Sequence, residues 1–269
     1  MTRLITDWIK DMEMTAKAWD IKLRDMTGLG YIELASIAAE STVEDILYDM
    51  EEYKVAVVPV TSGQGVIGNF AEAVAAIVRS MGYEVFVTER TDVDGLYEAS
   101  VRDADFALLA DDNRYIAINL YNGGVADNNI ATAMGYTELL RNMAGDLEDE
   151  PVAVLGYGII GQLMALNLAE AGARVAVFDK DSEKRAQVEA DGYLWIDEGE
   201  LKEYKYIADA TNEGGWLTAD KINTEEVVIV APGIPLSLDD DAKAAVEGRY
   251  IHDMLEIGTA TMLGMVIFG

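Results

Sequence analysis

The sequence predicts an α/β protein with two domains: N-terminal helices and a first α/β unit, then a doubly wound parallel sheet. Three observations lead to this prediction. Apolar residues recur at helical spacing before residue 50. From residue 54 onward, short apolar strands alternate with helical segments. The alternation restarts at Pro151, after the polar run GDLEDEP. We therefore expect one domain over residues 1–149 and a second over residues 150–269.

The first domain opens with two helical stretches. Apolar positions at helical spacing predict a helix over residues 6–26, capped by Thr6 and ended by Gly28, and a second helical stretch running to about Met50. Strands follow at 54–60, 84–88 and 105–110, with a glycine turn and a helix at 69–82 between the first two. The loop 111–116 then precedes a long helix from about Val125 to Met143.

The second domain repeats a strand–helix pattern. Strands are expected at 152–156 and 174–179, a helix at 183–190, and further strands near 193–196, 206–210 and 226–232. This order is typical of the Rossmann fold, whose parallel sheet is covered on both faces. The apolar end of the chain, ATMLGMVIFG, has ten residues, too few to span a bilayer, and is interpreted as a docked terminal helix.

Composition excludes several classes of function. The chain has 49 acidic and 20 basic residues, and its net charge of −29 would repel nucleic acid and anionic lipid. Such a surplus of carboxylates suits a cytosol rich in salt. The chain has no cysteine, so redox chemistry requires a cofactor, and with His252 as its one histidine we expect no dedicated metal site. We expect a cytoplasmic protein that acts on a small molecule.

The motif GYGIIG at 156–161 carries the strongest functional signal. Gly156 permits a tight turn, Gly158 lets a pyrophosphate approach the backbone where Ile159 and Ile160 begin a helix, and Gly161 lets helix and strand pack closely. The next strand ends in Asp179, 23 residues after Gly156, where a carboxylate accepts hydrogen bonds from the adenosine ribose. Because this carboxylate would repel a 2′-phosphate, we expect NAD as the cofactor.

A second copy of the pattern, GQGVIG at 63–68, departs from the template. Pro59 lies inside its strand, Thr61 and Ser62 precede the glycines, and Glu89 comes three residues later than the Asp179 spacing. We do not assign NAD to it. An anion site and a plain strand-to-helix turn remain equally good interpretations.

Other candidate residues follow predicted strands. Thr211, Asn212, Pro232 and Gly233 either line the nicotinamide half of the cofactor site or belong to ordinary loops. The acidic pair Asp111 and Asp112, followed by Asn113, either holds a cationic amine or caps a turn. The run Asp127, Asn128 and Asn129 offers helix caps or ligand donors, and capping is the more economical interpretation.

Taken together, VPVTSGQGVIGNF, the ADDN turn, GYGIIG, APGIP and GTATML resemble the pyrrolysine synthase (PylD) family over the whole chain. The resemblance implies an NAD-dependent oxidation of the terminal amine of an L-lysine–3-methyl-D-ornithine isopeptide, followed by ammonia release and ring closure to pyrrolysine. It also implies a methanogenic archaeal source, which the acidic composition suggests is salt-adapted.

The resemblance further assigns residue roles. Leu4, Val60, Ser62 and Ile67 would line the substrate pocket, and Asp111 and Asn128 would hold polar groups. Asp253, at a position where the family has glutamate, would bind or deprotonate the amine next to the nicotinamide. Asp253 and Asp111 are thus the expected catalytic carboxylates, and Asp253 contacts cofactor as well as substrate.

Two alternatives remain open at this point. One is a two-domain dehydrogenase of shikimate or methylene-folate type, which would need a catalytic lysine in the first domain. Between Asp49 and Glu150 the chain offers only Lys54, at the start of a strand. The other is a non-catalytic NAD-sensing module. The sequence allows a homodimer but does not specify the oligomeric state, the salt requirement, the identity of the general base or the use of a divalent cation.

Overall fold

The structure is a computed structural model that describes residues 4–268, without the side chains of Asp49 and Phe268. It divides into two compact units. Unit 1 comprises Met1–Asp25, Leu29–Gly135 and Met254–Gly269, and unit 2 comprises Met26–Gly28 and Tyr136–Asp253. This division differs from a boundary at residue 149. Helix α7 (Asn128–Ala144) runs across it, and the terminal helix α11 (Glu256–Phe268) groups with unit 1.

Helices form the N-terminal part of unit 1: α1 (Thr6–Ile9), α2 (Met12–Thr27, whose last two residues group with unit 2), α3 (Tyr31–Ala38) and α4 (Val43–Glu52). The predicted first helix is therefore interrupted between Ile9 and Met12. Gly30 is the N-cap of α3, and its N–H donates to the Glu33 carboxylate at 2.9 Å. The buried Tyr31 hydroxyl donates to the Ala16 carbonyl at 3.1 Å and so joins α3 to α2.

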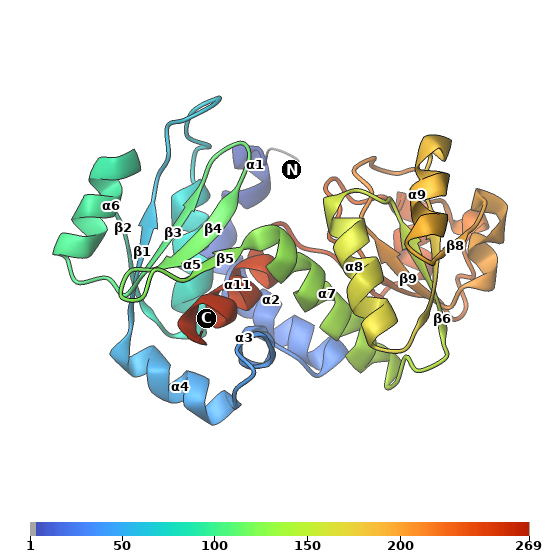
Figure 1. Cartoon of the computed structure of the whole chain (residues 1–269), viewed down its shortest axis with the longest axis horizontal. Helices are drawn as coiled ribbons and strands as arrows, with labels where there is room; N and C mark the ends of the chain where they lie inside the picture. The colour runs from blue at the N-terminus through green and yellow to red at the C-terminus, as the bar shows by residue number, and fades with distance from the viewer. Residues whose placement is uncertain (1–3, 269) are drawn as a thin grey trace. The chain divides into compact units, whose positions relative to one another are not determined.

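A mixed sheet with strand order β2-β1-β3-β4-β5 forms the centre of unit 1 (Figure 1). Its strands are β1 (Lys54–Val58), β2 (Glu84–Val87), β3 (Phe106–Ala110), β4 (Tyr115–Asn119) and β5 (Val125–Asp127), connected in part by α5 (Phe70–Met81) and α6 (Asp92–Val101). β1 pairs in parallel with β2 and β3, whereas β4 pairs antiparallel with β3 and β5. Strand β4 begins inside the expected loop 111–116, and β5 occupies the expected start of the long helix, which begins at Asn128 instead of Val125.

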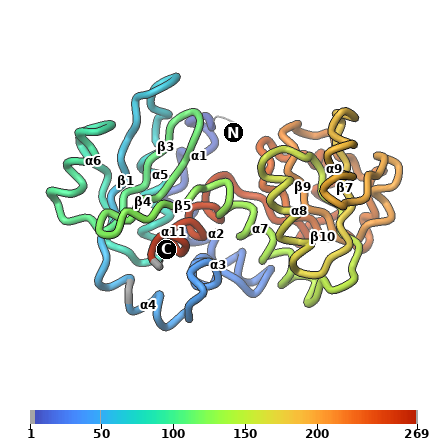
Figure 2. The backbone as a smooth tube through the Cα atoms, viewed as in Figure 1, coloured from blue at the N-terminus to red at the C-terminus, as the bar shows by residue number. Residues whose placement is uncertain are grey.

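Helix α11 is apolar, and most of its residues are buried within unit 1. It packs against α3, and a Cβ on Gly264 would lie 2.6 Å from Ala35 Cα, so the two backbones touch (Figure 2). Thr259 of α11 shares a hydrogen bond of 3.0 Å with the buried Tyr115 hydroxyl of β4. Because these contacts join the end of the chain to its beginning, α11 stabilises unit 1 rather than the domain that precedes it in sequence.

Unit 2 holds an all-parallel sheet with strand order β11-β10-β9-β6-β7-β8, which confirms the Rossmann prediction. Its strands are β6 (Pro151–Leu155), β7 (Arg174–Phe178), β8 (Leu194–Trp195), β9 (Tyr206–Asp209), β10 (Val228–Val230) and β11 (Tyr250–Ile251). Its helices are α8 (Ile159–Glu170), α9 (Arg185–Ala190) and α10 (Asp240–Ala245), with short 3-10 helices η1 (Ser182–Lys184), η2 (Glu198–Glu203) and η3 (Ala219–Lys221).

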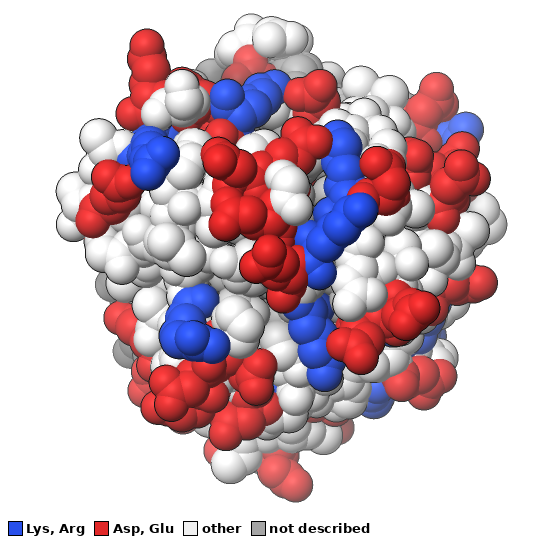
Figure 3. Space-filling model, turned by 90° about the vertical axis from the view of Figure 1, so that its right-hand side faces the viewer, with Lys and Arg blue, Asp and Glu red and all other residues white. Residues whose placement is uncertain are grey.

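The face in Figure 3 displays the acidic surplus: carboxylates spread over it, and lysine and arginine side chains form a band between them. Among residues 4–268, no helix is long and apolar enough to cross a membrane.

Candidate functional site

The glycine turn of unit 2 has the geometry that dinucleotide binding requires. Gly156 follows the buried strand β6 with φ of 82°, a left-handed conformation, and its N–H donates to the Phe178 carbonyl at 2.8 Å. A Cβ on Gly161 would overlap the Gly156 carbonyl oxygen, whereas a Cβ on Gly158 would meet nothing within 4 Å. Gly161 therefore packs directly against the Gly156 backbone, whereas the space beside Gly158 is open.

That opening lies at the start of α8. Gly158 is the N-cap, and no described side chain caps the helix. Ile159, the first helical residue, is 64% exposed. Unpaired amides and the positive end of the helix dipole favour an anion at this position. The residues present thus fit a dinucleotide pyrophosphate.

Asp179 lies beside the glycine turn, directly after β7. Its carboxylate accepts hydrogen bonds from the Tyr157 amide at 2.6 Å, the Asp181 amide at 2.9 Å and Lys184 Nζ at 2.8 Å. Burial opposes ionisation, but these three donors outweigh it, and the pKa of Asp179 lies below its ordinary value. Asp179 is therefore a charged acceptor at the predicted ribose position.

A buried carboxylate that the sequence did not single out organises the neighbouring loops. Asp209, at the end of β9, is 1% exposed. It accepts hydrogen bonds from the Thr211 amide at 2.9 Å, from Thr211 Oγ1 at 2.6 Å and from the Ser237 hydroxyl. Thr211 Oγ1 in turn accepts from Trp216 Nε1 at 3.0 Å. Asp209 thus joins the loop after β9 to the loop after β10.

The predicted nicotinamide-side residues belong to these same two loops. A Cβ on Gly156 would lie 3.2 Å from Thr211 Cγ2, and a Cβ on Gly233 would overlap the Thr211 carbonyl. Gly233, with Pro232 beside it in sequence, therefore lies against Thr211 at the carboxyl edge of the sheet. Asn212 follows Thr211 in the same loop. The structure brings Gly156, Thr211 and Gly233 together as neighbours.

His252 and Asp253 follow β11. The carbonyl of Ala231 can only accept, so His252 Nδ1 carries a proton and donates to it at 2.8 Å. Burial lowers the pKa of His252, which favours the neutral ring. The buried Asp253 carboxylate accepts from the Tyr136 hydroxyl at 3.2 Å, and the Asp253 amide donates to that same oxygen at 3.0 Å.

In unit 1, the first glycine turn is tied down by two carboxylates. Asp92, at the start of α6, accepts from the Thr61 amide at 2.8 Å and the Thr61 hydroxyl at 2.6 Å. Asp112 accepts from the Gln64 amide at 2.6 Å. Asp112, the second residue of the acidic pair, therefore binds the backbone of the glycine turn. This contact favours a positioning role for Asp112.

Asp111 closes the β3–β4 hairpin. Its Oδ1 accepts from the amides of Asn113 and Arg114, each at 2.8 Å. These bonds hold the pKa of Asp111 below its ordinary value. The turn-capping interpretation thus describes the observed contacts. The same ionised group has the charge that would attract an ammonium ion.

Asn128 lies against the first turn of α11, the helix that begins with Glu256. Asn128 is the first residue of α7, and its buried Oδ1 has no hydrogen-bond partner among the described atoms. A Cβ on Gly258, in the first turn of α11, would lie 2.6 Å from that oxygen. Two residues earlier, the buried Glu256 carboxylate accepts from the amides of Met254 and Leu255 at 3.2 and 3.0 Å. Burial raises the pKa of Glu256 despite those amides.

Glu256 is a further candidate that the sequence does not single out. It lies two residues before the motif GTATML, and nothing local separates it from the other 48 acidic residues of the chain. A Glu as the first residue of an apolar helix is the signal in the sequence that points to it.

The remaining predicted pocket residues lie in the loops of unit 1. Leu4 is buried, two residues before α1, and a Cβ on Gly68 at the end of the glycine turn would lie 3.1 Å from Thr6 Oγ1. Val60 and Ile67 are half-buried and Ser62 is exposed. Their role in substrate binding stays a prediction.

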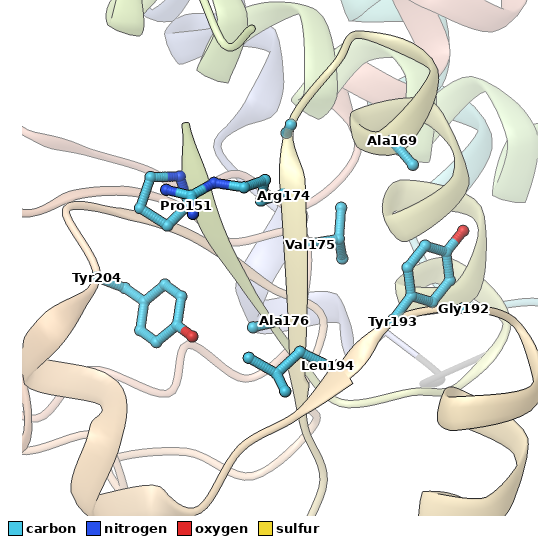
Figure 4. Close-up of a pocket in the computed structure, with 10 residues that line it drawn as sticks. Pro151, Ala169, Arg174, Val175, Ala176, Gly192, Tyr193, Leu194 and Tyr204 are labelled. Atoms are coloured by element: carbon cyan, nitrogen blue, oxygen red, sulfur yellow. The ribbon is translucent and has the colours of Figure 1, made fainter. Parts of the chain in front are cut away.

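Two further observations limit the site. Among the described residues, no group of three or more His, Asp or Glu side chains is arranged to hold a metal ion. A cavity of about 470 Å³ lies at the opposite, amino edge of the unit 2 sheet, where Pro151, Arg174 and Leu194 begin their strands and Tyr193 and Tyr204 flank them (Figure 4). This cavity is remote from the glycine turn, which follows the carboxyl end of β6.

Comparison with known proteins adds independent information. A family model described as "Pyrrolysine biosynthesis protein PylD, N-terminal domain" matches residues 10–126, and one described as "NAD binding domain of 6-phosphogluconate dehydrogenase" matches residues 151–223. Pyrrolysine synthase of Methanosarcina barkeri is 35% identical over 216 residues, which cover 80% of this chain and 81% of that protein.

Solved structures share the fold at low sequence identity. Shikimate 5-dehydrogenase of Thermus thermophilus, in complex with NADP(H) and shikimate, matches with a TM-score of 0.51 and 18% identity over 77% of this chain and 90% of that one. The bifunctional methylenetetrahydrofolate dehydrogenase/cyclohydrolase FolD of Campylobacter jejuni matches with a TM-score of 0.52 and 16% identity over 94% of this chain and 95% of that one.

The Rossmann unit, its glycine turn and the matched NAD-binding model define an oxidoreductase that uses a nicotinamide cofactor. The identity to M. barkeri pyrrolysine synthase extends over most of both chains. The chain belongs to the pyrrolysine synthase family.

Proposed function

We propose that this protein catalyses the last step of pyrrolysine biosynthesis. In this proposal the terminal amine of the L-lysine–3-methyl-D-ornithine isopeptide is oxidised with NAD. Hydrolysis then releases ammonia and leaves an aldehyde, which condenses with the ornithine α-amine to close the pyrroline ring. The 35% identity to pyrrolysine synthase over 80% of the chain carries the proposal.

The residues of unit 2 support the cofactor assignment. The amides at the start of α8 and the open space at Gly158 would hold the pyrophosphate, and Asp179 would accept from the adenosine ribose. Thr211, Pro232 and Gly233 would form the nicotinamide end. When bound, NAD supplies the hydride acceptor.

Charge and proton transfer divide among the carboxylates in this proposal. Asp111 has a lowered pKa, so it binds an ammonium group well and removes its proton poorly. Asn128 offers an unpartnered buried oxygen to a polar group of the substrate. Asp253 remains the proposed base. Glu256, whose pKa is raised by burial, is the second candidate for that proton transfer.

The position of Lys54 disfavours the shikimate-type alternative. Lys54 begins β1 at the amino edge of the unit 1 sheet, its Nζ lies 3.0 Å from Glu84 Oε1, and it covers the Phe86 ring at 5.9 Å. The glycine turn and Asp111 follow the carboxyl ends of β1 and β3. A lysine at the opposite edge of the sheet cannot act as the proton donor of a substrate held at those residues.

The test mixes purified protein, NAD and the isopeptide and follows NADH by its near-ultraviolet absorbance. We expect NADH formation and one ammonia released per NADH. Gly158→Ala should abolish turnover by blocking the backbone that the pyrophosphate approaches. Gly199→Ala is the matched control, because a Cβ there also meets nothing within 4 Å and Gly199 lies in η2.

Protein that folds and binds NAD but forms no NADH from this isopeptide would refute the proposal. Equal turnover in Gly158→Ala and Gly199→Ala would refute the assignment of the cofactor to the glycine turn.

A further inference from the structure

Lys184 forms an ion pair with Asp179, the carboxylate at the predicted ribose position, because the chain turns back after β7. After β7 the chain turns through η1, where the Asp181 side chain accepts from the Glu183 amide at 3.1 Å. This turn brings Lys184 back to Asp179, five residues earlier, with Nζ at 2.8 Å from Oδ2. The side chains are 34% and 6% exposed respectively, so this ion pair is partly shielded from solvent.

The other two cationic side chains of this segment, Lys180 and Arg185, form ion pairs with different carboxylates. Lys180 Nζ donates to Glu213 Oε2 at 2.7 Å, and Arg185 Nε donates to Glu189 Oε1 at 2.8 Å. All four of these side chains are more than half exposed. Lys184 is thus the cation held directly on the carboxylate that would meet the 2′ position of the adenosine ribose.

The ion pair between Lys184 and Asp179 affects how the site would discriminate between NAD and NADP. A bare carboxylate excludes a 2′-phosphate by repulsion, whereas a carboxylate already paired with an ammonium repels it less. The ammonium is also the group that would bind a phosphate if its carboxylate partner were neutral. The two side chains therefore act in opposite directions on the choice between NAD and NADP.

We propose that Lys184 is a specificity-determining residue of the dinucleotide site. It holds Asp179 in place as the ribose acceptor and, as the latent phosphate ligand, limits how strongly the site rejects NADP. The inference rests on the proposed assignment of a nicotinamide cofactor to unit 2, and it is independent of the substrate.

The experiment measures dissociation constants for NAD and NADP calorimetrically and compares their ratio, Kd for NADP over Kd for NAD. Lys184→Met should raise this ratio, because Asp179 then lacks its cationic partner and its charge repels the 2′-phosphate more strongly. Asp179→Asn should lower it by about tenfold, the scale of one partly screened, charge-assisted hydrogen bond. The double variant Asp179→Asn/Lys184→Met should lose that gain in NADP binding. Arg185→Met, which removes the next cation along the chain, is the control and should leave the ratio unchanged.

Equal ratios in Asp179→Asn and the double variant would overturn the inference, as would an effect of Arg185→Met equal to that of Lys184→Met. If Asp179→Asn fails to fold, Lys184→Met decides alone, and an unchanged ratio in it overturns the inference. Wild-type protein that binds neither dinucleotide would overturn the cofactor assignment as well. Binding with the expected ratios but no turnover of the isopeptide would overturn the proposed function alone.

Discussion

Replacing Asp209 tests whether a buried carboxylate network organises the cofactor loops. Asp209→Ala removes the acceptor of the Thr211 amide, the Thr211 hydroxyl and the Ser237 hydroxyl. Asp209→Asn keeps one carbonyl oxygen for Thr211 and offers an amide that can donate to Ser237 Oγ. The two variants therefore separate the loss of the network from the loss of its charge.

The expected magnitudes follow from burial. Asp209 and Ser237 are 1% and 2% exposed, so water does not replace the partner that Ser237 loses, whereas the two donors of the half-buried Thr211 keep some access to water. Each stranded donor costs roughly 1–3 kcal/mol, and three of them predict that Asp209→Ala lowers the free energy of unfolding by about 4 kcal/mol. Asp209→Asn should cost less than about 1.5 kcal/mol, since most of the hydrogen bonds survive. Because Thr211 packs against Gly156 and Gly233, Asp209→Ala should also weaken NAD binding.

The pH dependence has a definite sign. Burial raises the pKa of Asp209, although the hydrogen bonds from Ser237 and Thr211 oppose it. The folded protein therefore binds this proton more tightly than the unfolded chain does. The associated stabilisation is fully present below the unfolded pKa of about 3.9 and is lost as pH rises through the folded pKa. Relative to Asp209→Asn, the wild type should lose stability as pH rises from about 4.

Urea unfolding followed by circular dichroism measures these differences, and calorimetric titration measures NAD binding. Asp220→Ala is the matched control, because its carboxylate in the same unit is fully exposed. The reasoning is refuted if Asp209→Ala destabilises the protein no more than Asp220→Ala, or if wild type and Asp209→Asn show parallel pH profiles.

Three further predictions use other parts of the structure. Gly161→Ala places a methyl group on the Gly156 carbonyl and should cost about 3 kcal/mol in urea unfolding; a loss no greater than that of Gly199→Ala contradicts the packing argument. Burial lowers the pKa of His252, so stability should fall as pH drops through the unfolded pKa of about 6.5, and a wild-type urea midpoint that shifts no more than that of His252→Gln between pH 7.5 and 5.5 argues against this. With a net charge of −29, the melting temperature should rise as KCl increases from about 0.1 M, where the Debye length is about 10 Å; a melting temperature insensitive to salt contradicts salt adaptation.

The geometry of the unit 2 glycine turn could be predicted because its signal is local. Gly156, Gly158 and Gly161 lie within one turn, and their roles depend on φ and on space for a Cβ. Asp179 ends the next strand of a βαβ unit, whose geometry brings neighbouring strand ends together. The Lys184 contact was not predicted, because it depends on how η1 turns the chain.

Other features had no local signal. The strand YIAIN (β4) alternates buried and half-buried residues, but the expected loop 111–116 includes its first two residues, and no element is expected over the other three. Asp209 and Glu256 could not be separated from 47 other acids, since burial distinguishes them and burial depends on distant segments. The roles proposed for Leu4, Val60, Ser62, Ile67 and Asp253 rest on the resemblance and stay predictions.

The sequence by itself determined the α/β class, the Rossmann unit, the close glycine turn with Asp179 beside it, and the family. Each of these depends on residue types at short, regular spacing. Tertiary structure decided that α11 returns to unit 1, that Asp112 holds a turn, that Lys184 pairs with Asp179, and which carboxylates are buried. The physical reason is that burial and ion pairing are set by residues far apart in the chain, or by turns whose direction depends on their surroundings.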